Sequence, residues 1–220
     1  MKDLNNVKCV VNNIINETFT ALQTVYQKQN NDLQIIFPEY ASHNKRSGKI
    51  RISEQELRFA FVEVAKKLTK DNGWHYSVET PTYFYYKSAR NGNDSCIGGA
   101  RSGKIDLTLY DDSKLPVALI EFKAGSLSVD DENHCNKALK YDMIKLIAET
   151  RHYQCLGYSL HLMDNSSYLK SFDSHLIAAT EIIKGSKCLK EFESKEIKNF
   201  NLEISELKKY IFYETCILNK

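Results

Sequence analysis

Two carboxylates and a lysine lie at the ends of two neighbouring hydrophobic segments of this 220-residue chain. Glu121 and Lys123 directly follow the apolar run 116–120, and the alternation of a β-strand puts both side chains on one face. Asp106 lies on the polar face of the segment 104–110, which a short turn connects to that run. Unpaired charges beside a buried strand are costly, so we expect these three side chains to converge at one end of a sheet.

Converging carboxylates repel one another unless a cation neutralises them. Oxygen ligands with room for water suit Mg²⁺ or Mn²⁺, so Asp106 and Glu121 are the expected metal ligands. Lys123 is then placed to position an attacking water, and the metal to stabilise the negative charge that develops on a phosphate. A salt-bridge cluster at two strand ends is the structural alternative for the same residues.

Hydrophobic periodicity predicts the elements that position these residues. The predicted elements, in chain order, are helices over 5–28 and 53–70, strands over 74–87, 104–110 and 117–120, a helix over 134–149, a strand over 154–163 and a helix over 167–184. The tail from 195 to 218 mixes strand-like and helix-like signals. Glu79 is interpreted as a surface residue of its strand, the alternative being that it faces the same site as Asp106. This order predicts a single α/β domain with no linker.

Asp106, a spacer of fourteen residues and then Glu121-Phe122-Lys123 resemble the signature of the PD-(D/E)XK nuclease superfamily, the fold of many restriction endonucleases. The residue before Asp106 is Ile105, where that signature usually has proline. The resemblance covers about residues 53–163 and implies a restriction-endonuclease-like central mixed β-sheet flanked by α-helices. We therefore expect one nuclease-like domain with an N-terminal helix and basic loop over 1–52, a catalytic core over 53–163 and a helical or strand extension over 164–220.

The helix before the sheet in that family typically contributes a further glutamate, and Glu56 is the matching residue. The resemblance therefore implies that Glu56 assists catalysis as a third metal ligand beside Asp106 and Glu121. Glu56 also lies three residues after Ser53, which is the spacing of a capping box. A structural role in capping the helix therefore accounts for a glutamate at position 56 without any metal.

Basic residues near these elements are expected to hold the phosphate backbone of a nucleic acid. They lie in two predicted loops, 43–51 and 87–104, and on the predicted helix 134–149. The residues are Lys45, Arg46, Lys49 and Arg51 in the first loop, Arg90, Arg101 and Lys104 in the second, and Lys137 and Lys140 on the helix. The structural alternative is that these basic residues bind no ligand. They would then be solvated in the two loops and on the helix face, with Asp142 and Lys145 in local pairing.

The resemblance implies a Mg²⁺-dependent or Mn²⁺-dependent hydrolase of phosphodiester bonds, typically a DNA endonuclease of restriction or phage-defence type. It also implies double-stranded DNA as the substrate and action as a homo-oligomer. Because an unregulated nuclease endangers its host, we expect an activator or partner protein. The alternative is a member of the fold that has lost catalysis and serves as a nucleic-acid-binding or assembly subunit. A third hypothesis is an interaction protein with a chance motif.

Composition excludes several other classes of protein. With 42% hydrophobic residues, nine glycines and three prolines, the chain can bury a core and is neither disordered nor collagen-like. The formal net charge of +2 neither predicts nor excludes a nucleic-acid partner. The six cysteines show no C-x-x-C spacing and are expected to be reduced. We find no membrane-spanning run and no signal peptide, so a soluble, cytoplasmic protein without a membrane partner is expected.

Overall fold

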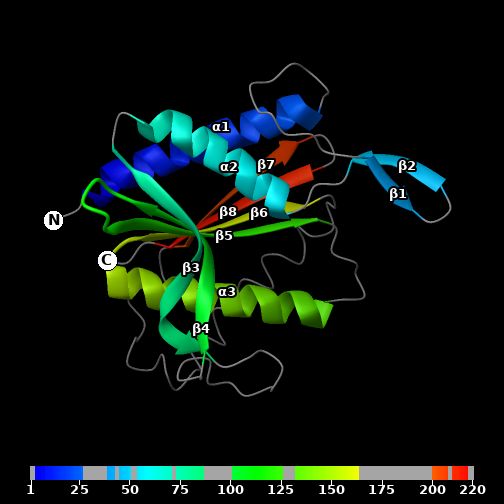
Figure 1. The fold of residues 1–220 in the computed structure, drawn as a ribbon. Helices are drawn as coiled ribbons and strands as arrows, with labels where there is room; N and C mark the ends of the chain where they lie inside the picture. Colours follow the sequence, from blue (N-terminus) through cyan, green and yellow to red (C-terminus); the bar gives the residue numbers. More distant parts are fainter. Residues whose placement is uncertain are drawn as a thin grey trace.

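The computed structural model describes most of the expected core. The described residues are 3–26, 39–42, 45–50, 54–70, 73–86, 101–125, 132–163, 200–207 and 210–217. They form, in chain order, α1 (Leu4–Tyr26), β1 (Glu39–Ser42), β2 (Lys45–Ile50), α2 (Glu54–Thr69), β3 (His75–Tyr86), β4 (Arg101–Tyr110), β5 (Pro116–Gly125), α3 (Glu132–Tyr153), β6 (Leu156–Met163), β7 (Phe200–Leu207) and β8 (Tyr210–Ile217) (Figure 1).

Six of these strands form one mixed sheet in the order β3-β4-β5-β6-β8-β7, while β1 and β2 pair as a separate hairpin. β5 and β6 run parallel, and all other neighbours in the sheet are antiparallel. Parallel neighbours need a long crossover, which α3 provides. Figure 1 shows α1 and α2 on one face of the sheet and α3 on the other. The prediction of an α/β fold with a central mixed sheet is confirmed.

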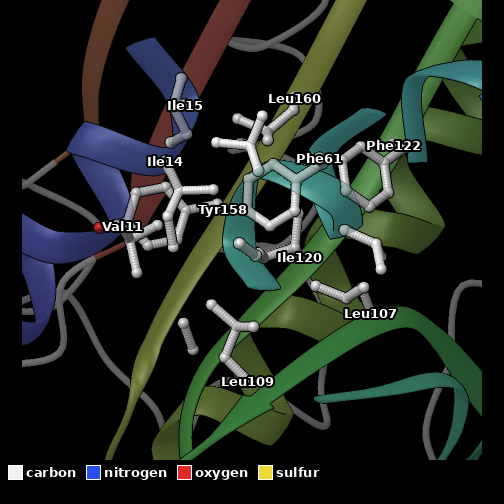
Figure 2. Close-up of a cluster of buried hydrophobic side chains, with 14 of the residues drawn as sticks. Val11, Ile14, Ile15, Phe61, Leu107, Leu109, Ile120, Phe122, Tyr158 and Leu160 are labelled. Carbon is white, nitrogen blue, oxygen red and sulfur yellow. The ribbon is translucent and has the colours of Figure 1, made fainter. Parts of the chain in front are cut away.

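Each face of the sheet is covered by an apolar helix face. On one side Val11 and Ile14 of α1 and Phe61 of α2 pack on the strands, and the rings of Phe61 and Phe122 meet edge to face at 5.4 Å (Figure 2). On the other side α3 packs on Leu119. β5 is apolar on both faces because it lies in the middle of the sheet. None of the helices within the described residues is long and apolar enough to span a membrane.

Some predicted boundaries are wrong. The basic segment 43–51, expected to be a loop, contains strand β2, and β4 begins at Arg101 rather than at residue 104. Both errors arise because backbone pairing, which needs no apolar alternation, extends these strands into polar sequence. The ambiguous tail forms the hairpin of β7 and β8. The helix predicted over 167–184 lies outside the described residues.

Candidate functional site

The site lies where β4 and β5 separate. The two strands pair as far as Leu107 and Ile120, and Asp106 and Glu121 stand one position further along. There Asp106 turns toward β5, and its Oδ2 accepts a hydrogen bond of 2.8 Å from the backbone N–H of Phe122. The structure therefore brings Asp106 against the Glu121-Phe122-Lys123 segment, as the sequence pattern predicts.

Lys123 connects the two helical layers at the end of β5. Its Nζ lies 2.9 Å from Oδ2 of Asp142 on α3 and 3.6 Å from Oε2 of Glu54 on α2. It also donates a hydrogen bond of 3.2 Å to the backbone oxygen of Phe122. A single ammonium group thus bridges an acidic residue from each face of the sheet.

Glu121 is neutralised by a lysine from α3. Its side chain is 2% exposed, and its Oε1 lies 2.7 Å from Nζ of Lys145. The same Nζ lies 3.1 Å from Oδ1 of Asp142 and donates a hydrogen bond of 2.8 Å to the backbone oxygen of Lys104. Lys145 is therefore held by three oxygens, two of them from carboxylates.

Arg58 of α2 connects Asp106 with Glu79 and Glu54. Its side chain is 6% exposed, and Nη2 donates to Oδ1 of Asp106 while Nη1 donates to Oε1 of Glu79, each at 2.8 Å. Nη2 also lies 3.5 Å from Oε1 of Glu54. Lys104 reaches the other oxygen of Glu79 at 3.4 Å. Both oxygens of Asp106 are therefore occupied, one by a guanidinium and one by a backbone N–H.

These contacts join nine charged side chains into one network, which we term the charged cluster. Its members are Glu54, Arg58, Glu79, Lys104, Asp106, Glu121, Lys123, Asp142 and Lys145. Five carboxylates face four cations, which leaves one excess negative charge when all are ionised. Removing so many charges from water costs free energy, and such costly clusters are concentrated at functional sites.

Burial and mutual charge shift several pKa values in the cluster. Burial, and then the carboxylate of Asp142, raise the pKa of Glu121 well above 4.5, although Lys145 opposes the shift. Burial alone would lower the pKa of Lys123, but Asp142 and Glu54 more than offset it, so the pKa of Lys123 is raised. Burial also raises the pKa of Glu54. Lys123 therefore keeps its proton at neutral pH and acts as a cation and hydrogen-bond donor.

The carboxylate that α2 contributes to the cluster is that of Glu54. Glu56, which the family resemblance implies, is two residues further along, about 200° around the helix axis. The ion pairs of this first turn with Arg58 and Lys123 are made by Glu54. A metal role for Glu56 stays a prediction, and the geometry favours Glu54 in its place.

The predicted phosphate-binding residues fall into three groups. Arg101 and Lys104 are exposed on β4, and Lys104 pairs with Glu79 of the charged cluster. The backbone places Lys45, Arg46 and Lys49 on β2 and Lys137 and Lys140 on α3. Arg51 and Arg90 lie outside the described residues.

The donor chemistry of the cluster fits Mg²⁺ or Mn²⁺, since its acidic side chains offer hard oxygen ligands. Among the residues that the structure describes, no three Asp, Glu, His or Cys side chains are arranged to hold a metal ion. Asp106 is paired instead with Arg58 and the Phe122 N–H, and Glu121 with Lys145. The chain's own cations thus supply the charge that a metal would supply, and Arg58 and Lys145 would have to give way to it.

Comparisons with known proteins add no second line of evidence. No family model, curated protein or solved structure matches the chain.

His161, which the sequence did not mark, lies beside the cluster. It stands opposite Lys123 in the parallel register of β5 and β6, and its buried ring places Nε2 2.7 Å from Oγ of Ser159. Burial, and then the positive charge of Lys123, lower the pKa of His161 from 6.5 to about 3. The imidazole is therefore neutral in the folded protein at neutral pH.

This depressed pKa is expected to make the fold sensitive to acid. Below pH 6.5 the His161 side chain binds a proton in the unfolded state but not in the folded state. The free energy of unfolding therefore falls as the pH drops toward 3. The slope from this one group approaches about 1.4 kcal/mol per pH unit. Urea denaturation at several pH values is expected to show a smaller acid slope for His161→Asn than for the wild type. An unchanged slope would contradict the assignment.

Proposed function

We propose that this protein is a Mg²⁺-dependent or Mn²⁺-dependent nuclease with a restriction-endonuclease-like fold, acting on DNA. The observation that carries the proposal is the convergence of Asp106, Glu121 and Lys123 where β4 and β5 separate, with Glu54 contributed by the preceding helix. The family resemblance implies that these residues lie on neighbouring strands, with one helix before and one helix after them in the chain. The order α2-β3-β4-β5-α3-β6 agrees with that expectation.

Each residue has a distinct role in this proposal. Asp106 and Glu121 would hold the metal with help from Glu54 or Asp142, and the bound metal would stabilise negative charge on the scissile phosphate. Lys123, which keeps its proton, would orient the attacking water by donating a hydrogen bond to it. Action as a homo-oligomer and control by an activator or partner protein belong to the same proposal.

One observation favours the alternative of a fold that binds nucleic acid without cleaving it. Both oxygens of Asp106 are engaged, and Glu121 is paired with Lys145. A protein that had lost its metal could keep a carboxylate cluster by neutralising it with its own cations. Arg58 and Lys145 provide such neutralisation in this structure.

Cleavage assays test the two candidates. Supercoiled plasmid, single-stranded circular DNA and RNA are incubated with the protein in Mg²⁺ or Mn²⁺ and, as a control, in EDTA. We expect metal-dependent cleavage that falls at least about a hundredfold in Asp106→Asn and Lys123→Ala, because the first weakens a metal ligand and the second removes the hydrogen-bond donor that orients the attacking water.

Matched variants carry the same chemical change away from the site. Asp112→Asn, in the exposed turn between β4 and β5, and Lys66→Ala, on the exposed face of α2, are expected to cleave like the wild type. Equal cleavage by Asp106→Asn and Asp112→Asn would reject the catalytic assignment. Nucleic-acid binding with no cleavage under any metal would favour the inactive alternative.

A further inference from the structure

Four aromatic rings form a cluster where the end of β3 meets the end of α3. The ring of Tyr83 stacks on that of His152 with centroids 3.6 Å apart and planes inclined by 16°, and Phe84 and Tyr153 meet His152 edge to face. Tyr83 is nevertheless 57% exposed. Since His152 covers one face of the Tyr83 ring, the opposite face is the one open to solvent.

The backbone beneath this ring is fixed by a buried carboxylate. Glu149, which is 1% exposed, accepts hydrogen bonds from the backbone N–H groups of Tyr83 at 2.8 Å and Phe84 at 3.0 Å. It also accepts one from the hydroxyl of Tyr86 at 2.9 Å. The exposed ring is therefore held in place before any ligand arrives, which lowers the entropic cost of stacking on it.

The surroundings of the ring are basic. Arg151 is exposed next to His152 on α3, and Arg101 is exposed on β4 opposite Tyr86 of β3, whereas the ammonium of Lys104 pairs with Glu79. The segments 82–86, 101–105 and 151–153 contain no Asp or Glu. An aromatic face among cations is the combination that binds single-stranded nucleic acid, with bases on the ring and phosphates near the cations.

This surface adjoins the charged cluster. A Cβ built on Gly103 of β4 would lie 3.2 Å from Tyr86 and 3.3 Å from the side chains of Thr82 and Lys145, so strands β3 and β4 pack directly on the lysine that holds Glu121. Along α3, His152 lies seven residues beyond Lys145, a distance of about 10 Å. That span corresponds to about three stacked nucleotides.

We propose that Tyr83, backed by His152, is a stacking platform for an unpaired base, and that the ligand of this face is single-stranded nucleic acid or a single-stranded segment. The position of the base relative to a cleaved phosphate rests on the proposed nuclease function. Binding of a base to the platform does not rest on that function. This substrate class differs from the double-stranded DNA that the family resemblance implies.

Fluorescence anisotropy in EDTA measures binding without cleavage. The probes are a labelled single-stranded DNA oligonucleotide, the RNA of the same sequence and the corresponding DNA duplex. We expect the wild type to bind a single strand more tightly than the duplex, and Tyr83→Ala to bind the single strand about 5- to 100-fold more weakly. Tyr83→Phe, which keeps the ring, is expected to bind like the wild type.

Two further variants separate stacking from folding. Tyr85→Ala removes a tyrosine of similar exposure, 56%, that lies outside the ring cluster, and is expected to leave binding unchanged. His152→Ala removes the support of the Tyr83 ring and is expected to weaken binding, whereas His152→Phe keeps it. Thermal unfolding confirms that each compared variant is folded.

The outcomes also separate this inference from the proposed function. Equal binding by Tyr83→Ala and Tyr85→Ala, or tighter binding of the duplex than of either single strand, would overturn the platform even if the protein cleaves DNA. Binding that depends on Tyr83 in a protein without cleavage would support the platform and reject the nuclease. Asp106→Asn is expected to lose cleavage and keep the binding.

Discussion

Replacing Lys145 with methionine is expected to lower the free energy of unfolding by about 3–5 kcal/mol, because it leaves the Glu121 carboxylate buried without a counter-ion. The Glu121 side chain is 2% exposed, and the Lys145 ammonium, 2.7 Å away, is its only ion-pair partner among the described residues. Methionine keeps most of the aliphatic stem that packs beside Gly103. Urea denaturation of Lys145→Met and of the exposed control Lys66→Met measures the difference.

A second substitution identifies the cause of this loss. In the double variant Lys145→Met with Glu121→Gln no charge is left unpaired between the two positions, so part of the lost stability is expected to return. The loss in Lys145→Met is also expected to shrink at acid pH. Burial already raises the pKa of Glu121, and below that raised pKa the carboxyl group is neutral and needs no partner. A double variant no more stable than Lys145→Met would contradict the argument.

The elements around the site could be predicted because local periodicity determines them. The apolar spacing of α2 and the alternation along β4 gave their positions to within a few residues, and the short turn after Tyr110 made β4 and β5 neighbours. Strand alternation then placed Glu121 and Lys123 on one face. The convergence of both residues with Asp106 follows from those local facts alone.

The partners of these residues could not be predicted, since they come from distant parts of the chain. Arg58 meets Asp106 across 48 positions, and no local pattern distinguishes a helical arginine that faces a sheet end from one that faces water. The sequence favours a local surface pair of Asp142 and Lys145, whereas both also pair with residues of β5. The sequence signal for this pairing is that an acidic and a basic residue, Asp142 and Lys145, lie among the apolar residues of the helix.

Glu79 shows a further limit, because its position depends on an irregular backbone. The residue adopts a positive φ of 51°, although the register of β3 on β4 is the same at Val78 and at Thr80 on either side of it. A positive φ is uncommon for a residue other than glycine and departs from the extended backbone of a strand, and here the carboxylate reaches Arg58. Regular alternation, on which the prediction of a surface glutamate rested, does not hold at such a position.

Replacing Arg58 with methionine is expected to destabilise the protein by about 3 kcal/mol when no divalent cation is present. Arg58 is the cation that Asp106 contacts, and it also pairs with Glu79. Because Glu79 is 43% exposed, water can take over its solvation, so most of the loss is assigned to the more buried Asp106. Thermal and urea denaturation of Arg58→Met and Lys66→Met measure this loss.

Divalent cations then test whether Arg58 occupies the place of a metal charge. If it does, Mg²⁺ or Mn²⁺ is expected to stabilise Arg58→Met more than the wild type, in which the guanidinium competes for Oδ1 of Asp106. A cation at a hundred times its dissociation constant adds about 2.7 kcal/mol. The double variant Arg58→Met with Asp106→Asn is expected to lose that gain. Equal stabilisation of wild type and Arg58→Met would mean that Arg58 does not compete with a metal, and the charged cluster would then be a structural salt-bridge network.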